Sequence, residues 1–226
     1  MRPRELISES LTPDGAPLTL TREGGDAYVI RISGVPLMSS RVHGSEEAMA
    51  DLCAGLAAPA RVLVGGLGMG FTLRATLDVL GPDAEVVVCE LLPILVEWNR
   101  GPLASLAGRP LDDPRASLVI DDVANVIRTS PRAFDAVLLD VDNAPDAFTV
   151  ESNAWLYGAR GLAAIRESLK PGGCVVVWSA ADKPDFVRAL SRAGLDAETI
   201  RVRARGKVRK GSQHFLYVGR LTRASR

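Results

Sequence analysis

The residues with the clearest chemical meaning are the glycines of a six-residue turn, Gly65, Gly66, Gly68 and Gly70, which follow a short apolar run. Glycines at such a place permit a tight turn and let the backbone approach a ligand closely. A dinucleotide-binding fingerprint needs glycines at its first, third and sixth positions. Neither Gly65 nor Gly66 as the first position places glycines at both of the others. The turn therefore predicts a ligand at this point of the chain and argues against NAD.

Acidic residues end the three apolar runs that come next, as Glu90, the pair Asp121 and Asp122, and Asp140. A carboxylate at the end of the second strand of such a domain can accept hydrogen bonds from ribose hydroxyls, which fits Glu90. Asp121 or Asp122 can accept a bond from an adenine amino group. Each acidic residue taken alone is more simply a helix cap or turn residue. Taken together and in order, they predict a cofactor of the adenosine type.

Asp140 and Asp142 are the candidate catalytic residues. Either carboxylate can hold a substrate amine and accept its proton. The alternative interpretation is structural: Asp140 caps the loop, and Asp142 with Asn143 forms a side-chain turn before Pro145.

The elements that must position these residues form an alternating pattern from residue 61 onward. Five short runs are apolar on both faces, as strands inside a parallel sheet must be when helices cover both sides. Helical segments separate them, which predicts a doubly wound, mostly parallel α/β sheet. Together with an antiparallel pair of strands near the C-terminus, the expected sheet has seven strands. The expected strands are 61–64, 85–89, 116–120, 136–139 and 174–178, and the expected helices are 71–80, 93–99, 123–129 and 154–169.

The two ends of the chain do not follow this alternation of strands and helices. Residues 18–22 and 27–32 flank a Glu-Gly-Gly-Asp segment and predict a β-hairpin. Ser45 is placed to cap a helix that runs from 46 to about 56. We therefore expect a small β-rich N-terminal cap at 1–57 and an α/β domain at 58–226. Residues 170–173 predict a helix stop, and 200–205 with 214–220 predict a terminal antiparallel pair.

Composition limits the possible classes of function. The 226 residues carry 27 basic and 27 acidic side chains, so no overall field attracts nucleic acid or an anionic membrane. No stretch has the length or apolarity of a membrane span or a signal peptide. Three widely spaced cysteines and two histidines predict reduced thiols, no metal site and a cytoplasmic enzyme.

From about Leu18 to Leu221 the chain resembles the class I S-adenosylmethionine-dependent methyltransferase fold, and within it the spermidine synthase-like branch. The resemblance is carried by Val62–Gly66 with the glycine turn, by Phe134–Asp140, by Leu156–Tyr157 with Leu169–Gly173, and by the N-terminal stretch 33–49. It implies S-adenosylmethionine or its decarboxylated form as cofactor, with Glu90 on the ribose and Asp122 near the adenine. It also implies a possible homodimer that pairs through N-terminal β segments.

Candidate substrate contacts are His43, Glu46, Asn143 and Tyr157. Glu46 and Glu47 can join Asp140 and Asp142 in an anionic pocket for an amine. Tyr157 ends an aromatic stretch, 148–157, that can lie over the substrate as a lid or simply anchor this segment to the core. His43, just before a glycine and a serine, fits a structural turn better than a general base.

The chain departs from the polyamine-synthase pattern at several positions. Gly68 stands where those enzymes carry an Asp inside the turn, and Leu37, Val42 and Glu46 stand where they carry Gln, Asp and Tyr. Asp140 and Asp142 are two positions apart, whereas the family's pair is three apart. A cationic aminopropyl tail needs nearby carboxylates, and an acidic turn would repel the carboxylate of ordinary S-adenosylmethionine.

On this electrostatic argument we expect methyl transfer to a small molecule in preference to aminopropyl transfer to an amine. A cofactor-binding module without catalysis is the alternative from another class. Alternating arginines at 201, 203 and 205 indicate a charged edge strand, or else a basic patch for an acidic substrate such as RNA.

Overall fold

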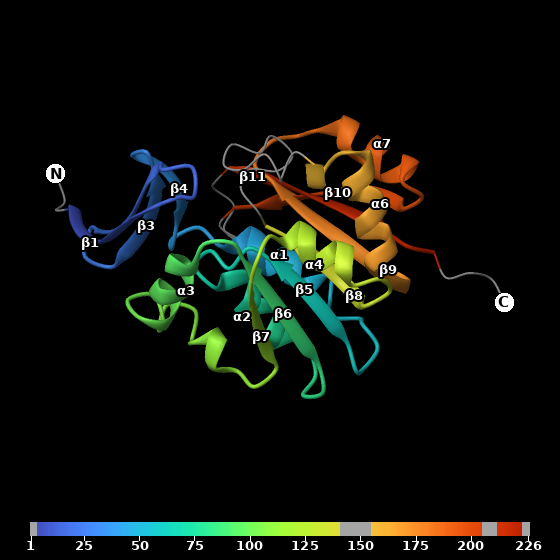
Figure 1. The fold of residues 1–226 in the computed structure, drawn as a ribbon, viewed down its shortest axis with the longest axis horizontal. Helices are drawn as coiled ribbons and strands as arrows, with labels where there is room; N and C mark the ends of the chain where they lie inside the picture. The colour runs from blue at the N-terminus through green and yellow to red at the C-terminus, as the bar shows by residue number, and fades with distance from the viewer. Residues whose placement is uncertain (1–3, 141–154, 205–211, 223–226) are drawn as a thin grey trace.

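The computed structural model describes residues 4–140, 155–204 and 212–222. These residues form two sheets, a four-stranded antiparallel sheet at the N-terminus and, beside it, a seven-stranded, mostly parallel sheet (Figure 1). The predicted α/β class with a small β-rich cap is confirmed.

The N-terminal sheet has the sequential order β1 (Arg4–Leu11), β2 (Pro17–Glu23), β3 (Ala27–Ile32) and β4 (Val35–Ser39). The predicted hairpin is β2 with β3, which pair antiparallel across Gly24 and Gly25, both at positive φ. The outer strands β1 and β4 were not predicted from the sequence. Both lie largely exposed at sheet edges, so their residues carry little of the apolar alternation that marks a strand.

The large sheet has the order β10-β11-β9-β8-β5-β6-β7. All five predicted parallel strands are present: β5 (Arg61–Gly65), β6 (Glu85–Glu90), β7 (Ala116–Ile120), β8 (Phe134–Leu139) and β9 (Leu169–Ser179). The chain leaves β5 toward β6 on one side and later returns to β8 on the other. The carboxyl end of β5 is therefore the point where strand order reverses, the place where open α/β sheets bind ligands.

The helix before β9 ends at Ser168, as the predicted helix stop requires, but residues 170–173 lie inside β9 and not before it. The strand absorbs the two glycines through an irregular register with β8 between Phe134 and Ala136. The terminal antiparallel pair is confirmed as β10 (Asp196–Arg203) with β11 (Gln213–Arg220). Arg201 and Arg203 are exposed on β10, while Arg205 lies outside the described residues.

Five helices lie close to their predicted places: α1 (Gly44–Asp51), α2 (Phe71–Val79), α3 (Pro93–Arg100), α4 (Val123–Thr129) and α6 (Ala159–Ser168). Helix α7 (Pro184–Arg192) was missed by sequence reasoning. Helix α1 begins one residue before Ser45 and has His43 at its N-cap position, so the predicted capping role of Ser45 is wrong. This helix packs on α2, β9 and β10, although the predicted division at residue 57 assigns it to the N-terminal cap.

Apolar side chains cover both faces of the large sheet, as the unbroken apolar runs require. One core cluster includes Leu63, Val137 and Tyr217, and the cluster on the other face includes Val62, Val64 and Leu138. Consecutive residues of β5 thus contribute to opposite faces. Among the described residues, no helix is long and apolar enough to cross a membrane.

The three cysteines are buried free thiols. Burial raises the pKa of Cys53 and of Cys89 to about 12. Such thiols are protonated at neutral pH and unreactive, which agrees with the prediction of structural, reduced cysteines.

Gly65 provides a test of the packing at the end of β5. A Cβ atom at this position would lie 2.9 Å from both Leu139 Cδ2 and Val123 Cγ2. We expect Gly65→Ala to lower the free energy of unfolding by about 1–3 kcal/mol through overpacking. Gly81→Ala is the matched control, because a Cβ there meets nothing within 4 Å. Urea unfolding of both variants checks the prediction, and equal stabilities would contradict it.

Candidate active site

The glycine turn joins β5 to α2 with a backbone that side chains rarely permit. Gly66, Gly68 and Gly70 have φ angles of 91°, 52° and 84°. Backbone hydrogen bonds hold the turn at both ends, from Gly66 N to Cys89 O at 2.8 Å and from Gly70 N to Leu67 O at 2.8 Å. The predicted role of these glycines as a tight ligand-binding turn thus has the backbone geometry it requires.

Glu90 fixes the turn from the end of β6. Its Oε2 accepts the Leu67 N–H at 2.8 Å, and its Oε1 accepts the Leu92 N–H at 2.8 Å. The residue is only 6% exposed. A carboxylate can accept more than two hydrogen bonds, so this geometry also suits contact with the hydroxyls of a bound sugar.

Asn99 on α3 is a second support of the turn, and sequence reasoning missed it. Its Nδ2 donates to Gly68 O and to Leu95 O, both at 2.8 Å, and the residue is buried. Its Oδ1 lies 3.0 Å from where a Cβ at Gly70 would be. An asparagine inside an otherwise apolar helix face was the signal available in the sequence.

Asp121 and Asp122 take the capping roles that the sequence also permitted. Asp122 is the N-cap of α4, and its Oδ1 accepts the Ala124 N–H at 2.8 Å. Asp121 Oδ1 accepts bonds from Asp122 N and from Asn125 Nδ2. Contact of either residue with adenine stays a prediction.

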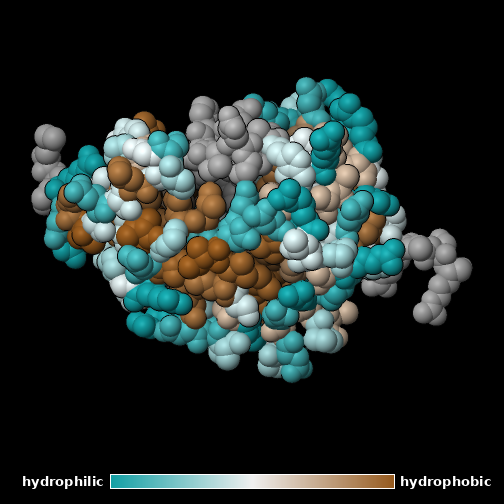
Figure 2. All heavy atoms as spheres, viewed as in Figure 1, coloured by the Kyte–Doolittle hydropathy of each residue, from teal (hydrophilic) through white to brown (hydrophobic). Residues whose placement is uncertain are grey.

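An apolar surface lies next to these carboxylates. Ile120, the last residue of β7, is 53% exposed. Figure 2 shows hydrophobic residues gathered in the middle of the molecular face that carries α3 and β7 in Figure 1. Such a surface beside acidic strand ends suits a flat, partly polar ring.

Asp140 follows β8 at the same edge of the sheet. Its N–H donates to Gly65 O at 3.0 Å, which ties it to the start of the glycine turn. Its Oδ2 accepts the Thr72 hydroxyl at 3.0 Å, from the first turn of α2. The other predicted residues of this loop, Asp142 and Asn143, lie outside the described residues.

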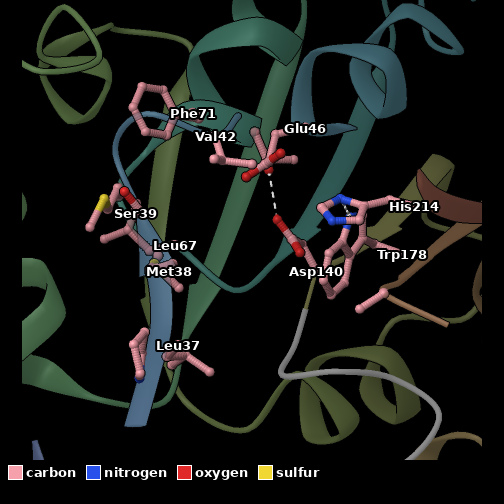
Figure 3. Close-up of a pocket in the computed structure, with 15 residues that line it drawn as sticks. Leu37, Met38, Ser39, Val42, Glu46, Leu67, Phe71, Asp140, Trp178 and His214 are labelled. Atoms are coloured by element: carbon pink, nitrogen blue, oxygen red, sulfur yellow. Dashed lines mark hydrogen bonds between the residues drawn. The ribbon is translucent and has the colours of Figure 1, made fainter. Parts of the chain in front are cut away.

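Asp140 lines a pocket of about 360 Å³ between the glycine turn, β4, α1 and the ends of β9 and β11 (Figure 3). Its described lining contains three ionisable side chains, those of Asp140, Glu46 and His214, and no Lys or Arg. The lining residues are Pro36, Leu37, Met38, Ser39, Val42, Glu46, Leu67, Gly68, Met69, Phe71, Thr72, Asp140, Trp178, Ala180 and His214. The pocket is thus mostly apolar and free of side-chain cations over these residues.

Glu46 reaches the pocket from α1, and its predicted contact with a substrate stays a prediction. Burial raises the pKa of its carboxyl. Its Oε2 accepts a hydrogen bond from the Ser45 hydroxyl at 2.7 Å, and Ser45 Oγ lies 2.9 Å from His214 Nδ1. Trp178 Nε1 approaches the same nitrogen at 3.3 Å. Sequence reasoning missed Ser45, Trp178 and His214 as parts of this site.

Met38 occupies the space above Gly68. A Cβ at Gly68 would lie 3.3 Å from both Sδ and Cε of Met38. Where an acidic side chain was expected from the family pattern, this chain therefore has a thioether against bare backbone.

His43 and Tyr157 are not among the described residues that line the pocket. His43 stacks on Phe71 at a ring-centroid distance of 4.3 Å, and its Nδ1 lies 2.9 Å from Glu47 Oε1. Tyr157 is 8% exposed and packs edge-on against Phe186. The structure thus gives Tyr157 a core position, which agrees with the anchoring role that the sequence offered as the alternative to a lid.

The fold and this site together define a class. A sheet of this order, with a glycine turn after its central strand and acidic residues at neighbouring strand ends, is the class I S-adenosylmethionine-dependent methyltransferase fold. Residues 28–192 match the family model described as the spermine/spermidine synthase domain. The chain belongs to this family, in agreement with the predicted spermidine synthase-like branch.

Curated relatives carry the name polyamine aminopropyltransferase. The one from Mycobacterium tuberculosis (strain ATCC 25618 / H37Rv) is 29% identical over 163 residues, which are 71% of this chain and 30% of the relative. The one from Aeropyrum pernix is 30% identical over 195 residues, which are 74% of this chain and 59% of the relative. The chain therefore spans about a third to three fifths of the length of these relatives.

Solved structures support the fold. The spermidine synthase from Thermotoga maritima has a TM-score of 0.75 at 18% identity, over 96% of this chain and 72% of that one. A spermidine synthase in complex with the transition state analogue AdoDATO has a TM-score of 0.78 at 20% identity, over 96% and 73%. These comparisons favour the aminopropyltransferase alternative, and the preference for methyl transfer gains no support beyond the shared fold.

The support that Glu90 gives the turn is testable. In Glu90→Gln an amide NH₂ must replace one oxygen, where it would face a backbone N–H donor. Leaving such a buried group unsatisfied costs about 1–3 kcal/mol in free energy of unfolding. Glu85→Gln, at the exposed opposite end of β6, is the matched control and should change stability by less than about 0.5 kcal/mol. Denaturant unfolding measures both variants, and a neutral Glu90→Gln would show that the contact is dispensable.

Proposed function

We propose that this chain transfers an aminopropyl group from decarboxylated S-adenosylmethionine to an amine. The observation that carries the proposal is the position of Asp140, which is bonded to the glycine turn and directed into a pocket without cationic side chains among its described lining residues. An amine nucleophile needs such a carboxylate close to the point where a cofactor on the turn would react. Membership of the spermine/spermidine synthase domain family and the names of the curated relatives support the same reaction.

The residues around the turn suit the adenosyl part of this cofactor. Glu90 would accept bonds from the ribose hydroxyls, and Asp122 with the exposed Ile120 would hold the adenine. The positive φ angles of Gly66 and Gly68 favour glycine at both positions, and glycine has no Cβ to separate the backbone from a cofactor. When bound, the sulfonium supplies a carbon that is already activated for displacement.

The protein's own part in the reaction is orientation and proton transfer. Thr72 fixes the Asp140 carboxylate by donating to its Oδ2. Asp140 then holds the acceptor nitrogen in line with the reactive carbon and takes up the proton that this nitrogen loses as the new C–N bond forms. The bond from that carbon to sulfur breaks, and its electron pair stays on the sulfur.

Methyl transfer is the second candidate, and Gly68 is the observation that favours it. With Met38 against Gly68, this position of the turn carries no acidic side chain that would repel the carboxylate of ordinary S-adenosylmethionine. The same absence leaves the aminopropyl ammonium without a carboxylate partner at this position of the turn.

The two reactions differ in the sulfur product. We expect the purified protein, given a pool of primary amines, to convert decarboxylated S-adenosylmethionine to methylthioadenosine, because aminopropyl transfer leaves that thioether. Methyl transfer from S-adenosylmethionine would instead give S-adenosylhomocysteine. Liquid chromatography with mass spectrometry separates these products and also reports the mass gained by the amine.

Asp140→Asn is the variant for this assay, and we expect it to lower the rate by about 100-fold or more through loss of the proton acceptor. Binding of methylthioadenosine, measured by calorimetry, should survive in this variant. Formation of S-adenosylhomocysteine alone would establish methyl transfer. Cofactor binding with no product in either case would establish the non-catalytic binding module.

Gly68→Asp tests the electrostatic argument directly. The substitution is made together with Met38→Ala, because Met38 fills the space that the new side chain needs. We expect the double variant to favour the decarboxylated cofactor over S-adenosylmethionine by about tenfold more than the wild type does, since a carboxylate attracts the ammonium and repels the carboxylate. Met38→Ala alone is the control, and calorimetric dissociation constants for both cofactors are the readout. An unchanged ratio in the folded double variant would contradict the argument.

A further inference from the structure

The peptide bond between Gly68 and Met69 is the centre of the glycine turn. The Gly70 N–H donates to Leu67 O at 2.8 Å, so these four residues form a hydrogen-bonded turn with Gly68 and Met69 in the middle. Gly68 has a φ of 52°, whereas Met69 is not among the residues with positive φ. A positive φ at the first central residue alone is the pattern of a type II′ turn, and turn types differ in how this central peptide is oriented.

Asn99 holds the carbonyl end of the central peptide. Its Nδ2 lies 2.8 Å from Gly68 O and 2.8 Å from Leu95 O. Both partners are carbonyl oxygens, which only accept, so the NH₂ group of the amide faces them and both of its protons are used. Asn99 is only 3% exposed, so this pair of hydrogen bonds is shielded from water.

The direction of the carbonyl also fixes the direction of the next N–H. A trans peptide is planar and carries its C=O and N–H on opposite sides. Because Gly68 O is directed at Asn99, the Met69 N–H is directed away from α3, and it has no hydrogen-bond acceptor among the described residues. Gly68 and Met69 are lining residues of the pocket, whereas Asn99 is not among the described ones that line it. Asn99 therefore contacts the turn from behind.

We propose that Asn99 is a positioning residue for the cofactor. It fixes the Gly68–Met69 peptide from behind and so determines the backbone surface, with the Met69 N–H, that the cofactor contacts on the other side. The inference rests on the cofactor site proposed above. It gives Asn99 no contact with the cofactor and no part in the transfer of the aminopropyl group.

The second half of the turn depends on Asn99 more than the first half does. Glu90 accepts the Leu67 N–H and so holds the beginning of the turn. From Gly68 to Gly70, Asn99 is the one described side chain that hydrogen-bonds to the backbone. Glycine has wide conformational freedom, so a turn of this composition needs an external contact to keep one conformation.

The oxygen of the same amide contacts the end of the turn. A Cβ at Gly70 would lie 3.0 Å from Asn99 Oδ1. Gly70 is the N-cap of α2 and has a φ of 84°. One buried side chain thus contacts both the central peptide of the turn and the residue at which α2 begins.

Binding of methylthioadenosine to Asn99→Leu tests the proposal, because leucine has a similar size and makes neither hydrogen bond. We expect the dissociation constant, measured by calorimetry, to rise about tenfold, the scale of one to two net hydrogen bonds. Ile165→Ala is the control for lost stability, since Ile165 is fully buried on α6 in a different core cluster from Leu67 and Met69. Its dissociation constant should stay within about twofold of the wild type. An unchanged affinity in folded Asn99→Leu, or an equal loss in both variants, would overturn the proposal.

Steady-state kinetics separate positioning from a part in the chemistry. With decarboxylated S-adenosylmethionine and an amine, Asn99→Leu should raise the KM of the cofactor about tenfold. The KM of the amine and the kcat should stay within about twofold, because Asp140 and its bond from Thr72 are retained. A fall in kcat as large as that expected for Asp140→Asn would overturn the assignment of Asn99 as a positioning residue.

Amide hydrogen exchange tests the turn without any ligand. The Gly70 N–H closes the turn on Leu67 O, whereas the Gly66 N–H donates to Cys89 O at its beginning. We expect Asn99→Leu to accelerate exchange at Gly70 about tenfold or more and to leave exchange at Gly66 within about twofold. If the wild type binds neither methylthioadenosine nor a cofactor, the proposed cofactor site fails and the role of Asn99 toward it fails as well. Equal exchange at Gly70 in the wild type and in Asn99→Leu would overturn the role of Asn99 alone.

Discussion

Two backbone N–H groups, those of Leu67 and Leu92, converge on the carboxylate of Glu90, and this contact joins the end of β6 to the turn after β5. A turn with three glycines at positive φ has little intrinsic preference for one conformation, because glycine loses more conformational freedom on folding than other residues. Glu90 from one side and Asn99 from the other hold it in place. The order of the turn also determines where α2 begins, and with α2 the position of Thr72.

Hydrogen bonds connect the turn to the rest of the site. Thr72 orients Asp140, and the Asp140 N–H returns to Gly65 at the start of the turn. The turn, the first residues of α2 and the end of β8 therefore form one hydrogen-bonded unit. A cofactor on the turn and an amine against Asp140 would contact the same unit. Their relative orientation, which is the main contribution such a protein can make to group transfer, would thus be built into the sheet.

The sequence supports prediction where a single local rule acts. Parallel strands such as β5 and β6 are apolar on both faces because helices cover them, and acidic strand ends meet because parallel strands end at one edge. The outer strands β1 and β4 could not be predicted, because residues on a partly exposed edge strand do not have to alternate between apolar and polar. The contact between Ser45 and His214 could not be predicted for another reason. These residues are 169 positions apart, and only the packing of α1 on the end of the large sheet brings them together. The contact of Met38 with Gly68 likewise depends on tertiary packing and not on a local sequence pattern.

Gly68 by itself does not decide which group the site transfers. An acidic side chain in the turn would interact with only one end of the cofactor, whereas the choice of reaction depends on all the charges that line the pocket. Asp140, Glu46 and the ring of Trp178 line one pocket, whose described side chains include no Lys or Arg. A cation against an aromatic face is stabilised with a smaller desolvation cost than a second buried ion pair. In the proposed reaction Asp140 would keep its role as proton acceptor, while the other lining residues would determine which amine fits.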